Sequence, residues 1–184
     1  MVDYRDVFER VTQDPRYRAN LDWGAARPGH PEGTVRAHIA ELERNLEAVK
    51  AELTESDYRK LRLLIHTHDT FKAEAEPGVS IMHPRSHASL ARAFLASFCD
   101  DADLLNMVQY HDEGYALWQQ LRRKGRYDEE RFDRLLAAID DWGLFLRFAI
   151  VDGCTEEKSR EPLRWLLDEV NERVPTRITG EAIR

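Results

Sequence analysis

Apolar residues recur at steps of three and four along almost the whole chain, and this period constrains the fold more than any other feature. Side chains with that spacing share one face of an α-helix, whereas a half-buried strand requires strict alternation. No stretch of the sequence alternates in that way, and no internal repeat is visible. The sequence therefore predicts an all-α fold in which amphipathic helices bury their apolar faces together.

The predicted helices follow one another with short connections. A segment rich in glycine and proline, 23–33, predicts an ordered loop, and Thr34 is the expected N-cap of the next helix. Asp101 or Asp103 would open a later helix, and Gly125 predicts a loop between two others. The predicted helices cover residues 3–11, 35–53, 56–72, 84–98, 101 or 103 to about 111–114, 115–123, 129–141, 142–152 and 162–173.

Length and cysteine usage predict one domain in a reducing compartment. With 184 residues the chain can bury a substantial core, and we expect residues 1–184 to form a single domain. Cys99 and Cys154 lack the spacing of a zinc site, so we expect both to be buried thiols. The N-terminus lacks the apolar core of a signal peptide, and the most apolar window, 144–151, is too short to span a bilayer. We therefore expect a soluble, cytoplasmic protein.

The charge balance indicates the kind of partner. The chain has 34 acidic and 27 basic side chains and a net charge of -7, which argues against a broad surface for nucleic acid or anionic membrane. A small molecule is the more natural partner. The sequence leaves the oligomeric state open, with a homodimer among the options.

Six polar side chains of the kinds that bind metals lie on the apolar faces of the predicted helices. His38, for example, follows Val35 by three residues and precedes Leu42 by four, and side chains at these steps point the same way. Two carboxylates and four imidazoles therefore converge on the core from five helical segments. They are His38, His68, Asp69, His87, His111 and Asp152.

A shared explanation is needed for so many inward polar groups. One inward histidine is usually a core residue bonded to the backbone, and that ordinary structural interpretation suits His66, His83 and His30 much better than it suits the six. Burying six ionisable groups without partners would cost too much free energy, and a bound metal supplies the partner. Imidazole and carboxylate suit one or two ions of Mn, Fe, Co, Ni or Zn, with positions left for water and substrate. Such an ion activates water and polarises a phosphoryl oxygen.

The order His38, then His68-Asp69, then Asp152 resembles the signature of the HD superfamily of metal-dependent phosphohydrolases, over about residues 30–155. The phrase LLIHTHDTFK is similar to the central helix of that family, with Lys72 where the family commonly has a lysine. FAIVDGCT resembles its last motif. The resemblance implies an HD-type helical domain with metal in its core, which hydrolyses a nucleotide or another small phosphate ester with metal-activated water.

Further histidines resemble those of HD proteins that hold two metals. His87 and His111, in SHASLARAFL and VQYHDEGY, fill these places, which would put Asp69 between the two ions. His83 is a rival for His87, which we prefer because Ala91 continues its apolar stripe. HPEGTVRAH also resembles the start of the HD domain attached to some bacterial tRNA nucleotidyltransferases, although the chain has no nucleotidyltransferase domain and an acidic balance.

Other residues have two interpretations each. Lys72 either neutralises phosphate charge or holds Asp69, or it is a surface lysine. Glu113 is either a general acid or base or an exposed carboxylate at a helix start. Arg85 and the basic run 122–126 either contact phosphate or are solvated. Three aromatic residues either line a base-binding pocket or pack in the core. They are Tyr115, Trp118 and Trp142.

Two other functions use the same residues. Some HD-fold proteins hold a di-iron pair and oxidise a substrate with dioxygen, and the order of the six ligands is compatible with theirs. Alternatively, the fold could sense a nucleotide without turnover, with the metal in a structural role. The intact ligand set argues against such a module, because a protein that had lost catalysis could also lose inward-facing histidine and aspartate.

Overall fold

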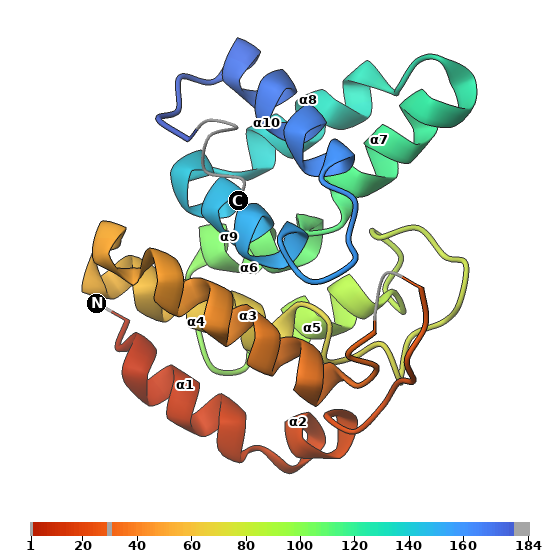
Figure 1. The fold of residues 1–184 in the computed structure, drawn as a ribbon. Helices are drawn as coiled ribbons and strands as arrows, with labels where there is room; N and C mark the ends of the chain where they lie inside the picture. Colours follow the sequence, from red (N-terminus) through yellow and green to blue (C-terminus); the bar gives the residue numbers. More distant parts are fainter. Residues whose placement is uncertain (1, 29–30, 179–184) are drawn as a thin grey trace.

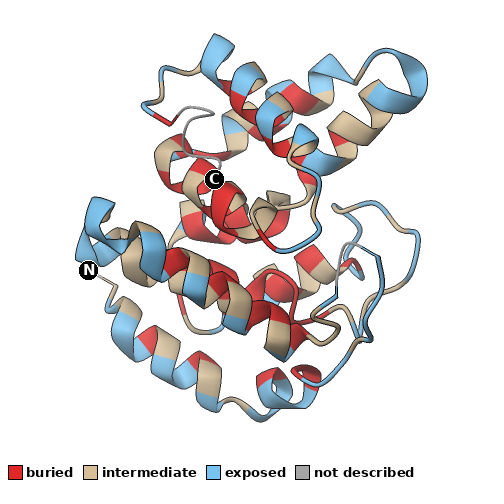
Figure 2. Ribbon diagram, in the orientation of Figure 1, coloured by how far each residue is buried: buried red, intermediate tan, exposed pale blue. Residues whose placement is uncertain are grey.

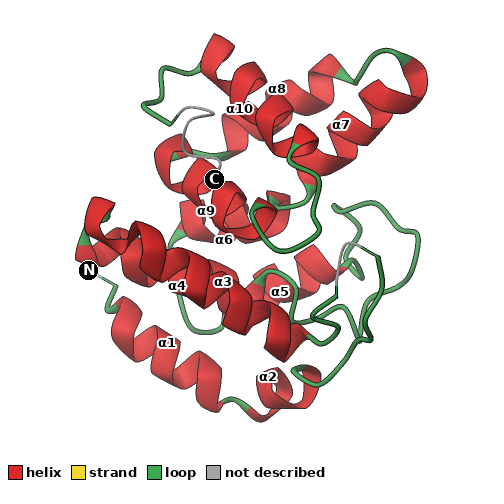
Figure 3. Cartoon of the chain, in the orientation of Figure 1, coloured by secondary structure: helices red, strands yellow, loops and turns green. Residues whose placement is uncertain are grey.

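A computed structural model describes residues 2–28 and 31–178, and it confirms the all-α prediction (Figures 1 and 3). No strand occurs within these two ranges, and an isolated backbone bridge joins Gly24 to Thr34. The helical elements are α1 (Tyr4–Gln13), α2 (Pro15–Asn20), α3 (Val35–Val49), the 3-10 helix η1 (Lys50–Glu52), α4 (Glu55–Thr67), α5 (His87–Leu95), α6 (Ala102–Tyr110), α7 (Glu113–Lys124), α8 (Glu129–Ala138), α9 (Trp142–Gly153) and α10 (Glu161–Arg173).

The predicted helix caps are present. Thr34 accepts a hydrogen bond from a backbone N–H in the first turn of α3, as expected of an N-cap. Asp101 caps α6 in the same way, whereas Asp103 accepts hydrogen bonds from backbone N–H groups at the start of α9. Gly125 ends α7 with a φ of 70°, a backbone conformation that favours glycine. Local side-chain chemistry therefore sets these boundaries.

The helix expected over 56–72 is shorter than predicted and ends at Thr67. His68 and Asp69 lie in the turns that follow it. Thr67 and Thr70 each donate their hydroxyl to the carbonyl four residues earlier, at 2.7 and 2.5 Å. Such side-chain hydrogen bonds compete with the regular ladder. His68 still donates its backbone N–H to the Leu64 carbonyl at 3.0 Å, and the tighter turns begin at Thr70, whose N–H donates to the Thr67 carbonyl at 3.3 Å. As neighbours in sequence, the side chains of His68 and Asp69 point in different directions.

Other boundaries also differ from the sequence prediction. The helix expected from 84 starts at His87, because Ser86 caps it. The long helix expected to reach 53 ends at Val49 and tightens into η1, and the one expected to reach 141 ends at Ala138. The short helix α2 was not predicted, although Asp14 as its N-cap and a proline in its first turn are recognisable signals.

Helix α4 is the centre of the packing. It contacts α1, α3, α5, α6 and α9, while α10 packs on α7 and α9 (Figure 1). At the start of α7, a Cβ added to Gly114 would lie 2.8 Å from a terminal methyl of Leu166 in α10, so the two helices approach closely here and a larger residue would require the leucine side chain to move. The carboxyl ends of α4, α6 and α9 and the amino end of α5 carry five of the six inward polar residues.

Apolar side chains on the inner faces of the helices form a connected core, which runs from Val7 in α1 to Ile178 beyond α10 (Figure 2). Cys99 is buried as expected, whereas Cys154, at the end of α9, is only half-buried. None of the helices that the structure describes combines the length and the apolar composition that a membrane crossing needs.

Candidate metal centre

The six inward residues of the sequence analysis lie in two adjoining groups that could each hold a metal ion. In each group, one ligand atom per residue lies within 4.8 Å of the others. The first ligand group consists of His38, His68 and Asp152, and the second consists of Asp69, His87 and His111. The two groups together form the candidate metal centre.

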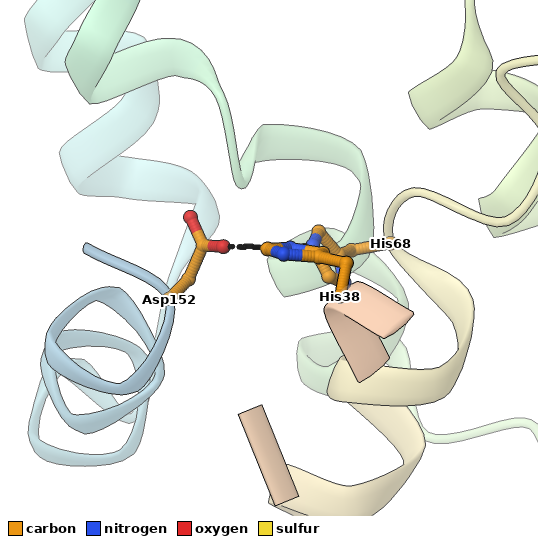
Figure 4. Close-up of side chains that lie close together, drawn as sticks. All are labelled: His38, His68 and Asp152. Atoms are coloured by element: carbon orange, nitrogen blue, oxygen red, sulfur yellow. Dashed lines mark ion pairs between the residues drawn. The ribbon is translucent and has the colours of Figure 1, made fainter. Parts of the chain in front are cut away.

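The first ligand group joins three helices. His38 comes from the first turns of α3, His68 from the end of α4, and Asp152 from the end of α9. Figure 4 shows both imidazoles close to the Asp152 carboxylate, with the His38–Asp152 ion pair drawn as a dashed line. His38 Nε2 lies 3.1 Å from Asp152 Oδ1, and His68 Nε2 lies 3.9 Å from it. These ligand atoms surround a space of the size that one ion requires.

The second ligand group lies at the start of α5 and the end of α6. His111 Nε2 is 3.4 Å from Asp69 Oδ1, and His87 Nε2 is 3.7 Å from the same oxygen. The two Nε2 atoms of His87 and His111 are 3.1 Å apart. Asp112 Oδ2 adds a second carboxylate oxygen, 3.2 Å from His87 Nε2. This group therefore has two nitrogen and two oxygen atoms close together.

Asp69 connects the two groups through its two carboxylate oxygens. Oδ1 faces His87 and His111, whereas Oδ2 lies 3.6 Å from His68 Nε2 and 3.9 Å from His38 Nε2. The ammonium of Lys72 donates to Oδ2 as well. One carboxylate oriented in this way can serve two ions at once.

Hydrogen bonds behind the imidazoles fix which nitrogen faces the centre. His68 Nδ1 is 3.0 Å from the Leu64 carbonyl, and His111 Nδ1 is 2.8 Å from the Val108 carbonyl. A carbonyl only accepts, so both Nδ1 atoms carry a proton and both Nε2 atoms face the centre, where the neutral His68 can offer a lone pair. His38 Nδ1 lies 3.2 Å from Glu32 Oε1, the carboxylate–histidine pairing common behind metal ligands.

The nitrogen and oxygen atoms of the two ligand groups are chemically suited to a metal ion. His68 Nε2 is buried and makes no hydrogen bond to any residue that the structure describes. A buried polar atom without such a partner is costly, and a metal ion would satisfy it. Imidazole nitrogens and carboxylate oxygens suit divalent transition metals, as the sequence analysis expected, while the identity of the ion is left open.

The electrostatics of the site also suit metal binding. Burial lowers the pKa of His68 to about 4 against the opposing effect of Asp69, so its imidazole is neutral at pH 7. Burial raises the pKa of Asp69 and Asp152, but the neighbouring lysine and histidine side chains together outweigh it and hold both pKa values well below the usual range; Lys72 contributes most at Asp69 and Lys158 most at Asp152. Both carboxylates are therefore charged, as ligation requires.

His111 behaves differently from His68. Burial lowers its pKa, but Asp112 and Asp69 outweigh burial and raise the value to about 9. Burial lowers the pKa of Lys72, but the carboxylates around it together outweigh burial and raise it; they are those of Asp69, Asp112 and Asp152. The centre thus holds several negative carboxylates that positive groups balance, and a divalent ion could replace part of that positive charge.

A cavity of about 440 Å³ opens on both ligand groups. Its polar wall includes the ammonium groups of Lys72 and Lys158, and its apolar wall includes Tyr115, Trp118 and Leu166. Tyr115 and Trp118 are stacked, with ring centroids 5.9 Å apart and planes inclined by 24°. The remaining lining residues are Pro28, His68, Asp69, His111, Asp112, Phe148, Ala149, Asp152, Gly153, Glu157, Ser159, Pro162 and Leu163.

The structure places other candidates elsewhere. Glu113 is buried and pairs with both nitrogens of the Arg131 fork that face it, and it does not line the cavity. The structure brings His87 into the second ligand group, whereas His83 is exposed on the preceding turn. Trp142 packs in the core. His30 lies outside the described residues.

The basic residues that were considered for phosphate binding also lie outside the cavity lining. Arg85 pairs with Glu76. Arg122 lies over the Trp118 ring at 5.9 Å from its centroid, on the far end of α7. The rest of the run 122–126 is exposed. This run is therefore a solvated helix end and turn.

Three residues of the site were not identified from the sequence. Asp112 follows His111 directly, so a second His-Asp dyad was a visible signal. Glu32 lies in the HPE phrase that precedes His38, and its spacing could have suggested a supporting carboxylate. Lys158 had no sequence signal, because a loop of unpredictable shape brings it to Asp152.

Comparisons with protein-family models, with curated proteins and with solved structures found no match to this chain. The similarity of its motifs to the HD superfamily therefore stays a prediction from the sequence.

Proposed function

We propose that this protein is a metal-dependent phosphohydrolase of the HD type, which acts on a nucleotide or another small phosphate ester. The observation that carries the proposal is the position of Asp69 between two ligand groups that share one cavity. A carboxylate with one oxygen toward each group can hold a pair of metal ions side by side, as two-metal hydrolysis uses them. We place the reaction in the cytoplasm, where the buried thiol of Cys99 would stay reduced.

Bound divalent ions would supply a water of lowered pKa and would polarise a phosphoryl oxygen. The residues of the chain provide the surroundings for that chemistry. His38, His68 and Asp152 would hold one ion, His87 and His111 the other, and Asp69 both. Lys72 holds Asp69 Oδ2 and lines the cavity, so it can both orient this carboxylate and attract phosphate.

The aromatic wall of the cavity favours a nucleotide over a simple phosphate ester. Tyr115 is 50% exposed although it stacks on Trp118, so an aromatic face is open to a ligand. Any nucleobase can stack on such a face, because every base has a π-face. The phosphate of such a ligand would then lie toward Lys72 and Lys158. A neutral substrate of an oxygenase would not need these two positive charges.

The proposal can be tested by metal removal and return. Chelator-treated protein should release no phosphate from a panel of nucleotides and phosphate esters, and Mn, Co, Mg or Ni should restore turnover. Asp133→Asn, which changes an exposed carboxylate on α8, serves as the control for loss of charge. Asp69→Asn should remain inactive with every metal.

Other outcomes would identify a different function. Bound iron, an absorption band that responds to oxygen and no phosphate release would indicate a di-iron oxygenase. Nucleotide binding without turnover in the presence of Mn or Co would indicate a non-catalytic binding module. Either result would overturn the phosphohydrolase proposal while leaving the ligand groups themselves in place.

A further inference from the structure

The loop between α9 and α10, residues 154–160, brings an ammonium group to the first ligand group. Lys158 Nζ donates to Asp152 Oδ1 at 2.9 Å and to the Asp152 backbone carbonyl at 3.2 Å. Its side chain is 21% exposed and lines the cavity. A lysine that came from a solvated loop would not usually be held in this way.

The loop has many internal hydrogen bonds. Arg160 Nη1 donates to the carbonyls of Gly153, Thr155 and Lys158 at 2.6, 3.0 and 3.0 Å. Thr155 is buried and its hydroxyl donates to the Asp152 carbonyl at 3.1 Å. Glu157 has a φ of 60°, a conformation that non-glycine residues keep only where the surroundings hold them. The position of Lys158 is therefore set by the loop and not by its own flexibility.

We propose that Lys158 is a substrate-binding residue that donates a hydrogen bond to the phosphate group in the cavity. The inference rests on the proposed function. An ammonium group has three N–H donors, and Asp152 accepts two of them. The third is available on the cavity side, where Lys72 presents a second ammonium group.

The charges around the cavity support this role. The carboxylates that line the cavity exceed the ammonium groups of Lys72 and Lys158 by two negative charges when the imidazoles are neutral; they are those of Asp69, Asp112, Asp152 and Glu157. Divalent ions at the two ligand groups would make the net charge of the same surroundings positive. A doubly charged phosphate would then be attracted to the part of the cavity that both lysines line. Lys158 could donate a hydrogen bond to it while keeping its hydrogen bonds to Asp152.

A lysine–aspartate pair elsewhere in the chain shows the alternative, which is a purely structural role. Lys60 Nζ lies 2.8 Å from Asp101 Oδ2, which also accepts from the Tyr4 hydroxyl at 2.6 Å. Lys60 does not line the metal-centre cavity. It is similarly placed in burial and pairing, and it therefore provides a matched control.

The experiment uses full-length protein loaded with Mn²⁺ and freed of excess metal, with inorganic phosphate as the probe in isothermal titration calorimetry. Lys158→Met should weaken phosphate binding by at least about tenfold, the effect of losing one charge-assisted hydrogen bond. Lys158→Arg should recover most of the affinity. Mn²⁺ binding in the absence of phosphate should be unchanged or tighter in Lys158→Met, because the ammonium group no longer competes for Asp152 Oδ1.

The controls separate this inference from the proposed function. Lys60→Met should lower the melting temperature and leave the phosphate affinity of the folded protein unchanged. Phosphate binding that is equal in wild type and Lys158→Met would overturn the role of Lys158 alone. A parallel loss of Mn²⁺ and phosphate affinity in Lys158→Met would also overturn it, because the residue would then only shape the metal site. A wild-type protein that binds none of Mn²⁺, Co²⁺, Mg²⁺ and Ni²⁺ would overturn the proposed function as well.

Discussion

His66 and His68 are two residues apart at the end of α4, but they face two different polar regions. His66 belongs to a cluster with Tyr17, Glu43 and Arg62, which we call the His66 cluster. Its Nδ1 lies 2.6 Å from the Tyr17 hydroxyl, and its Nε2 lies 2.8 Å from Glu43 Oε1. His68 has a backbone partner at Nδ1 only, and its Nε2 points into the metal centre.

The difference shows how a structural histidine can be distinguished from a candidate ligand. Both nitrogens of His66 are satisfied by neighbouring side chains, so this residue needs no further partner. In the metal centre, the polar atoms face one another across a cavity, and positive lysines balance the carboxylates. The polar atoms of the His66 cluster already have their hydrogen-bond partners, whereas those of the metal centre are suited to a bound cation.

The largest effect should come from the carboxylate that both ligand groups share. Asp69→Ala should abolish metal binding and phosphohydrolase activity, with little loss of helix content in circular dichroism. Supporting contacts behind a ligand are worth about 10- to 100-fold in affinity, and removal of a bridging ligand should exceed that range. An Asp69→Ala protein that remains active with a full metal content would refute the proposed site.

The two histidines provide the direct test of the comparison. His68→Gln should lower Mn²⁺ affinity by more than about 100-fold and change the free energy of unfolding of the metal-free protein by less than about 1 kcal/mol. His66→Gln should do the reverse, with unchanged Mn²⁺ affinity and a loss of about 1 to 2 kcal/mol, because two side-chain hydrogen bonds disappear. Calorimetric metal titration and urea unfolding of both variants would decide the matter. Equal effects of the two substitutions on metal affinity would contradict the distinction.

A smaller effect is expected at the aromatic wall, whose residues belong to neither ligand group. Tyr115→Ala should raise KM for a nucleoside monophosphate by about tenfold, the weight of one stacking contact. The KM for a phosphate ester without an aromatic group should not change. Steady-state kinetics with both substrates measures the difference, and a similar increase for both would remove the case for nucleobase recognition.

The smallest effect concerns the His66 cluster and its dependence on pH. Burial raises the pKa of Glu43, but hydrogen bonds from His66 and Arg62 outweigh it, so the net pKa lies below the usual value. A carboxyl whose pKa is lower in the folded state stabilises the protein above its unfolded pKa, and this stabilisation is lost as pH falls through the folded pKa. Glu43→Gln should therefore cost about 1 kcal/mol at pH 7. Urea unfolding from pH 7 to pH 3 should show the difference from wild type shrinking below about pH 4.5.

A pH-independent difference between Glu43→Gln and wild type would show that the carboxylate charge contributes nothing. Glu9→Gln is a suitable control, because Glu9 lies on α1 in an exposed pair with Arg5. Surface pairs of this kind contribute little. Its substitution should be nearly neutral at every pH.

Much of the fold was predictable from the local pattern, because helix periodicity and capping depend on residues only a few positions apart. The sequence predicted the positions of α3, α6, α9 and α10 to within a few residues. It missed α2 and extended α4 beyond Thr67, because back-bonding from the threonine hydroxyls is a weaker signal than the apolar stripe.

The sequence alone determined that these chemically active side chains lie on the inner faces of helices, because their spacing from leucine, valine and phenylalanine neighbours fixes the face. Only the tertiary structure decided how they combine. The turn after Thr67 directs the two Asp69 oxygens to different ligand groups, and the packing of α7 turns Glu113 toward Arg131. The loop after α9 brings Lys158 to Asp152. The helical period sets the direction of a side chain within its own helix, but distances between side chains on different elements depend on how helices dock and loops close.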